Sequence, residues 1–150
     1  FCGSWFAPII GRFLDRRGVR QGLLLESVSV AAVFLYAAWA VHGVTSGVLC
    51  GYAAMAAAFL AYILIFMTDH FNAVHTMLMR SLSESPADVM ENLSFGLSID
   101  HILAVTVSGL LGAVWKLSGP QWVFVLGAAV CAVDLAVALW LKRTETAPAK

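Results

Sequence analysis

Four stretches of about 20 residues, each almost free of charge, constrain this chain more than any other feature of its sequence. At about 1.5 Å per residue, a helix of that length spans about 30 Å, the thickness of the hydrocarbon core of a bilayer. A helix on the surface of a soluble protein has a polar face, which these stretches lack. The sequence therefore predicts an all-α fold, a bundle of transmembrane helices with spans at residues 22–41, 48–67, 97–115 and 121–141.

The composition also sets the chain apart from soluble domains. Of its 150 residues, 61% are hydrophobic and only 12% are charged. A soluble domain ordinarily carries about twice that share of charged residues. We expect the lipid bilayer as a partner and expect no nucleic acid.

Residues 1–10, FCGSWFAPII, have neither the basic start nor the small-residue cleavage site of a signal peptide. They resemble the last turns of a preceding membrane helix, with Pro8 near its end. We therefore expect one membrane domain, consisting of a helix end and four full spans, that forms part of a longer protein.

The basic residues predict which way the chain runs, because Lys and Arg accumulate on the cytoplasmic side of membrane proteins. We expect three cytoplasmic segments: a loop at 11–20, a linker at 69–95 and a tail at 142–150. This orientation leaves Lys116 outside and places the other eight basic residues inside: Arg12, Arg16, Arg17, Arg20, Arg80, Lys142, Arg143 and Lys150. The expected location is a cell membrane, plasma or inner, with a cytoplasmic C-terminus.

The loop at 11–20, GRFLDRRGVR, has a spacing that a simple topological anchor does not need. Gly11 would let its helix approach a neighbour closely, and Gly18 permits the backbone angles of a tight reversal. Asp15 can accept hydrogen bonds from the loop or from the N-terminus of a neighbouring helix. Arg16 and Arg20 can pair with carboxylates or lipid phosphates.

These five residues resemble the signature loop of major facilitator superfamily transporters, which joins the second and third helices of each six-helix half. The resemblance implies a conformational latch formed by Gly11, Asp15, Arg16, Gly18 and Arg20. It also implies that residues 1–10 end the eighth helix and that the four spans are the ninth to twelfth. Val19 departs from the family pattern, which often has a basic residue there. A degenerate copy is more usual in the second half, although the corresponding part of the first half stays open.

The resemblance implies transport of a small solute by alternating access, with the N-terminal remainder of the transporter as a partner. Neither the substrate nor a coupling ion can be read from the sequence. The alternative is a small membrane-embedded structural or assembly subunit of a larger complex. Small residues four apart, at Gly47–Gly51 and Ser108–Gly112, predict close helix contacts under either hypothesis.

Three acidic residues within the spans are the further site candidates, because ionisable groups at membrane depth are costly. Asp134 shares a helical stripe with small residues, so it is either a proton-coupling or substrate-binding carboxylate or an acid buried against a missing helix. Glu26 is expected to pair with an arginine of the adjacent loop. Asp100 lies near a helix start and is a candidate partner for a latch loop outside this chain.

The linker 69–95 allows two arrangements. Either two short helices lie on the inner membrane surface, or the flanking spans extend into the cytoplasm. Within it, Ser85 is expected to cap a helix that has Pro86 in its first position and Asp88 in its first turn.

No catalytic, cofactor-binding or metal motif is present in the sequence. His70 and His75 are five residues apart and diverge on a helix, so no metal site, no cofactor and no enzymatic activity are expected. An intramembrane enzyme would require Asp69-His70 and Asp100-His101 to meet at the inner interface.

Overall fold

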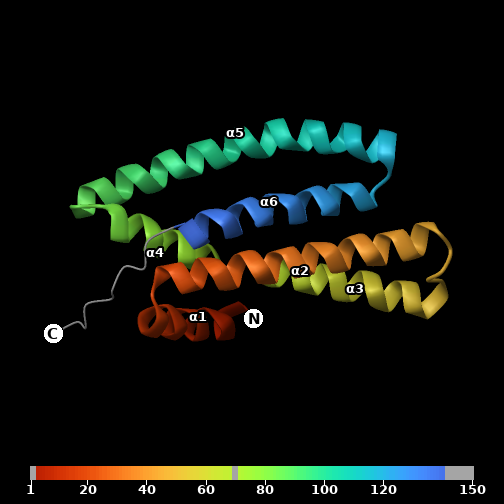
Figure 1. Ribbon diagram of the computed structural model, residues 1–150, viewed down its shortest axis with the longest axis horizontal. Coiled ribbons are helices and arrows are strands. Elements are labelled where there is room, and N and C mark those ends of the chain that lie inside the picture. The colour runs from red at the N-terminus through yellow and green to blue at the C-terminus, as the bar shows by residue number, and fades with distance from the viewer. Residues whose placement is uncertain (1–2, 69–70, 141–150) are drawn as a thin grey trace.

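The computed structural model describes residues 3–68 and 71–140, in which the regular structure is entirely helical (Figure 1). The helices are α1 (Gly3–Arg17), α2 (Val19–Thr45), α3 (Gly51–Thr68), α4 (Asn72–Leu82), α5 (Pro86–Ser118) and α6 (Gln121–Trp140). Four of them, α2, α3, α5 and α6, are long and apolar enough to cross a membrane. The prediction of an all-α fold with four apolar helices of membrane-spanning length is confirmed.

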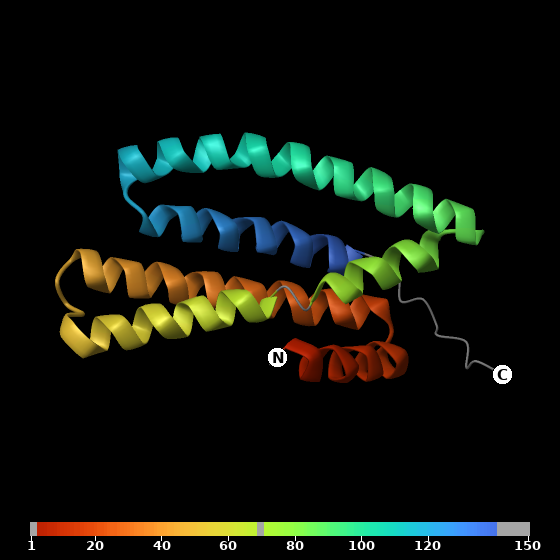
Figure 2. The ribbon, with the colours of Figure 1, turned by 180° about the vertical axis from the view of Figure 1, so that it is seen from behind.

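Successive long helices run in opposite directions, as Figures 1 and 2 show. The end of the bundle where α1 meets α2 also holds α4, and we call it the basic end. Arg16 and Arg17 lie in the last turn of α1 and Arg80 lies in the last turn of α4, whereas Lys116 lies in the last turn of α5 at the opposite end. The basic residues of the tail at 142–150 lie outside the described residues.

Helix α2 is the centre of the bundle and packs along α6 and α3. Its contact face is made of small side chains, and Ala37 and Ala40 are almost completely buried. On α6, a Cβ added to Gly127 would lie 3.1 Å from the ring of Phe34. Small residues let helix backbones approach closely where no hydrophobic effect drives association. The small-residue stripe predicted on the last span therefore packs on α2.

The predicted helix contact at Gly47–Gly51 is wrong. Gly47 lies in the turn between α2 and α3, Gly51 is the first residue of α3, and a Cβ at either glycine would have no neighbour within 4 Å. Their φ angles are +75° and +55°, which side chains rarely adopt, so both glycines serve the turn. The alanines of the same span that do pack are Ala57 and Ala61, which are buried.

The loop predicted at 11–20 is also wrong, because α1 continues through Arg17 and α2 begins at Val19. Only Gly18 interrupts the two helices. Its φ of +81° provides the tight reversal that the sequence predicted for it. Gly11 lies inside α1, and a Cβ there would meet nothing within 4 Å, so the close approach expected at this position is absent from the described residues.

The linker forms one short helix and the beginning of a long one, and its position relative to a membrane stays a prediction. Helix α4 is a separate short helix, whereas residues 86–95 form the start of α5, which runs unbroken for 33 residues. The predicted cap is present: the Ser85 hydroxyl accepts from the backbone N–H of Asp88, and the Asp88 carboxylate accepts from that of Ser85.

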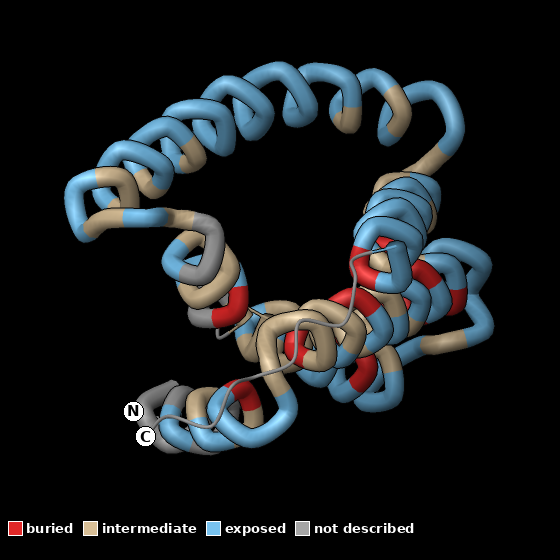
Figure 3. Tube along the Cα trace, turned by 60° about the vertical axis from the view of Figure 1, so that its left-hand side comes forward, coloured by how far each residue is buried: buried red, intermediate tan, exposed pale blue. Residues whose placement is uncertain are grey.

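Helix α5 stands apart from the rest of the bundle (Figure 3). It meets α4 at one end and α6 at the other, and no residue of α5 is buried. At about 1.5 Å per residue it is about 50 Å long. A helix of this length that is held only at its ends leaves most of its surface open to lipid or to other helices.

Candidate functional site

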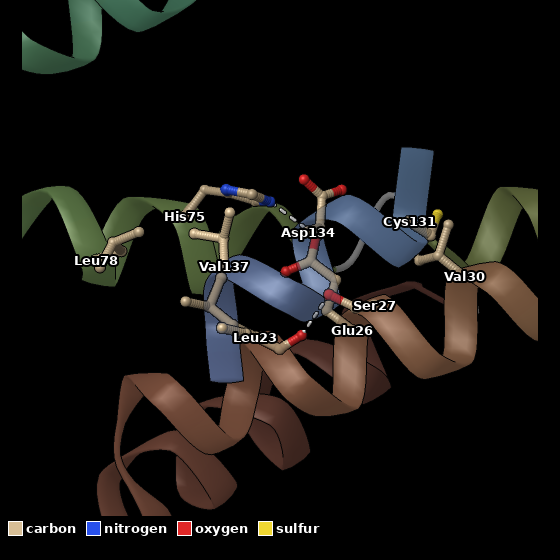
Figure 4. A pocket seen from close by; sticks show the side chains of 10 residues that line it. Leu23, Glu26, Ser27, Val30, His75, Leu78, Cys131, Asp134 and Val137 are labelled. Atoms are coloured by element: carbon tan, nitrogen blue, oxygen red, sulfur yellow. Dashed lines mark hydrogen bonds and ion pairs between the residues drawn. The ribbon is translucent and has the colours of Figure 1, made fainter. Parts of the chain in front are cut away.

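A pocket of about 180 Å³ lies near the basic end, between α2, α4 and α6 (Figure 4). Its walls are mainly apolar. Two of the three predicted acidic residues, Glu26 and Asp134, line it together with His75. The fold therefore brings two carboxylates and an imidazole around one small apolar space.

Glu26 of α2 pairs with His75 of α4, and the distance between Glu26 Oε1 and His75 Nε2 is 2.8 Å. The prediction that Glu26 pairs with an arginine of the adjacent segment is wrong. The Glu26 side chain is only 16% exposed, whereas that of His75 is 56% exposed. The second carboxylate oxygen, Oε2, is buried and has no hydrogen-bond partner among the described residues.

An apolar contact beside the pair holds α4 in place. Val74, the neighbour of His75, is fully buried, and Leu14 of α1 is 2% exposed. Both side chains meet at Gly22 of α2, where an added Cβ would collide with Leu14 and lie 3.2 Å from Val74 Cγ1. Because Gly22 has no side chain, α1 and α4 can both approach α2 at this point.

The pairing raises the pKa of His75 above its ordinary value of 6.5. The main cause is the hydrogen bond to Glu26; partial burial opposes it, and the negative charges of Glu26, Asp134 and Asp100 add to it. The charged form of the imidazole is therefore favoured in the folded protein.

Asp134 lines the pocket from α6, on the stripe that the sequence identified. Cys131 and Ala138 of this stripe are buried against the bundle, whereas Asp134 itself is exposed. Figure 4 shows its carboxylate pointing away from α2. Asp134 thus lies at the rim of the pocket, where it can act on a neighbouring charge or on a group that enters from outside.

The five residues of the proposed latch have different surroundings. Arg20 Nε and Nη2 donate to the backbone oxygens of Ala138 and Leu139, at 3.2 and 3.4 Å, and so cap the end of α6. A cation is favoured at a helix C-terminus, where carbonyl groups lack partners. Asp15 and Arg16, by contrast, are exposed at the end of α1.

Asp100 is exposed on α5, away from the pocket lining. The prediction that it lies near a helix start is wrong, because α5 begins at Pro86. Asp100 belongs to a row of residues spaced four apart along the helix, whose other members are small: Gly96, Ala104, Ser108 and Gly112. A Cβ at either of these glycines would have no neighbour within 4 Å. The described helices leave this row uncovered.

Sequence reasoning missed His75, which it considered only as a metal ligand beside His70. The available signal was an apolar stripe at helical spacing in the linker, formed by Phe71, Val74, Leu78 and Leu82. Such a stripe indicates a helix that packs on the bundle, and His75 directly follows one of its residues. Asp69 and His70 lie outside the described residues, and no group of three or more His, Cys, Asp or Glu side chains within the described part of the chain could hold a metal ion.

Comparison with known proteins identifies no relative: no family model, curated protein or solved structure matches the chain.

Proposed function

We propose that this chain is the C-terminal portion of a major facilitator-type secondary transporter, which moves a small solute by alternating access. The basic end is then cytoplasmic, as the positive-inside rule requires. The observation that carries the proposal is the reversal at Gly18. It joins α1 and α2 through a single residue of positive φ and leaves Asp15 and Arg16 exposed beside it. Those exposed charges are available to a part of the transporter outside this chain.

The surface of α5 supports the same proposal. Asp100 lies within a helix that is long and apolar enough to span a membrane, and no residue of this helix is buried by the other described helices. A carboxylate facing lipid is costly, whereas small residues at every fourth position suit contact with another helix. Further helices of the same transporter would cover this row and offer Asp100 a positive partner.

The same uncovered row also favours the second candidate, a subunit that binds a larger membrane complex. The two functions differ in what the exposed charges at the turn do. In a transporter, Asp15 takes part in a conformational change that every transport cycle repeats. In an assembly subunit, it contributes only to binding.

Replacement of Asp15 in the whole transporter tests the proposal. Proteoliposomes would be assayed for uptake of a panel of labelled sugars, amino acids and organic ions. We expect at least one solute to cross, and we expect Asp15→Asn to slow it about tenfold, the size of a typical coupling energy, without changing insertion. Glu84→Gln is the matched control, since Glu84 is another exposed acid at the basic end. No uptake of any solute, or equal losses in the two variants, would contradict the proposal.

A further inference from the structure

We propose that the Glu26–His75 pair is a proton-controlled strap. Protonated His75 holds α4 on α2, and loss of the proton releases α4 together with the adjoining end of α5. The strap does not depend on what the protein transports, and it stands on contacts that the proposed function does not use.

Helix α4 is short and depends on its contacts with the neighbouring helices. It has 11 residues, fewer than an isolated helix needs to be stable in water. Its described apolar anchor is Val74 against Leu14 and Gly22, and its ion pair with α2 is His75 with Glu26. A change in the charge of the pair therefore changes how strongly α4 is held on α2.

The carboxylate of Glu26 needs an opposite charge beside it. This residue belongs to a helix long enough to span a membrane, and one of its oxygens is buried without a partner. A buried carboxylate is tolerated when an opposite charge compensates it. Neutral His75 could still donate one hydrogen bond, but it would no longer supply that charge.

The other charged groups that act on His75 also favour its protonated form. Asp134 of α6 and Asp100 of α5 are both acidic, whereas α1 contributes Leu14 at this contact. Arg20, the nearby base on α2, is engaged with the backbone of α6. Loss of the proton from His75 thus removes the cation that these negative charges attract and leaves the Glu26 carboxylate uncompensated, which favours separation of α4 from α2.

The direction of the pH effect follows from the raised pKa of His75. A group whose pKa is higher in the docked state stabilises docking fully below its ordinary pKa of 6.5. That stabilisation is lost as the pH rises through the raised value. The strap is therefore closed in acid and open in alkali.

The release of α4 would also displace the start of α5. Residues 83–85 join the two helices, and this link is held to α5 by the capping box and by Asn92 Nδ2, which donates to Ser83 Oγ at 3.0 Å. The link therefore moves as one piece with the start of α5. No residue of α5 is buried against the other described helices, so none of them encloses its start.

A distance measurement between α2 and α4 tests the strap. Spin labels would replace Val28 on α2 and Arg80 on α4, both exposed, in the full chain in lipid nanodiscs with its native cysteines changed to alanine. Electron–electron double resonance at about pH 5 and about pH 9 brackets the ordinary imidazole range. We expect one narrow distance distribution in acid, and in alkali a severalfold loss of that population to longer distances. Identical distributions at both pH values would overturn the strap.

Two variants test whether the Glu26–His75 pair causes the pH-dependent release of α4. Glu26→Gln keeps the shape and removes the charge that His75 compensates, so docking of α4 should depend far less on pH. His75→Lys keeps a cation at both pH values, so α4 should stay docked in alkali. The control is His101→Gln, an exposed histidine on α5, which should leave the transition unchanged. Release of α4 in alkali despite His75→Lys, or loss of the transition in His101→Gln, would assign the effect to another group.

Discussion

At Gly22, three helices come so close that no side chain fits between them. Leu14 from α1 and Val74 from α4 both occupy the space that a Cβ would need. Both side chains are almost completely buried. A single hydrogen atom on the α2 backbone thus sets the position of α1 and α4, and with α4 the position of His75.

We expect Gly22→Ala to destabilise the protein by about 1–3 kcal/mol, the usual cost of overpacking a filled site. The measurement is the thermal unfolding midpoint in detergent or nanodiscs. Gly11→Ala is the control, since it lies in α1 where a Cβ meets nothing. Alanine favours helix over glycine by about 1 kcal/mol, so the control should be neutral or stabilising. Equal effects at the two glycines would contradict this account of the contact.

The sequence identified the three acidic candidates but not the partner of Glu26. The sequence identified Glu26, Asp134 and Asp100 because charge at membrane depth is rare and costly. It assigned Glu26 a wrong partner, because local arginines were close in sequence whereas His75 is 49 residues away. The docking of α4, a tertiary contact that no local pattern encodes, decides that pairing.

At the scale of elements, the reliable predictions were those with a local physical cause. The four spans follow from the length of their apolar runs, and the start of α5 follows from the side-chain chemistry of Ser85 and Asp88. The predicted loop at 11–20 failed because charged residues are also accepted in a helix that extends beyond the membrane. Only Gly18, with its positive φ, breaks the helix there.

The end of α6 depends on a side chain from another element. We expect Arg20→Gln to weaken the α2–α6 contact by about 1 kcal/mol, the net value of a typical hydrogen bond, because the distances to Ala138 and Leu139 are long. The thermal unfolding midpoint would measure the loss of stability. Arg12→Gln is the control, as an exposed arginine of α1. No difference between the two variants would mean that Arg20 does not cap α6.

At the scale of the whole molecule, the bundle is dense around α2 and open along α5. The part around α2 is dense because small residues of α3 and α6 pack against small residues of α2. The open part is a helix of 33 residues that carries Asp100 and a row of small residues, and none of its residues is buried. Our account assigns this surface to further helices of a transporter.

Photo-crosslinking from α5 in the native membrane tests whether further helices of the same polypeptide cover this surface. A photoreactive amino acid would replace Ala104, in the middle of the small-residue row, or Ile102, about 160° away around the helix. We expect position 104 to crosslink to a transmembrane segment of the same polypeptide outside residues 1–150. Position 102 should react mainly with lipid. Crosslinks from position 104 to lipid alone, or to a different protein, would contradict it.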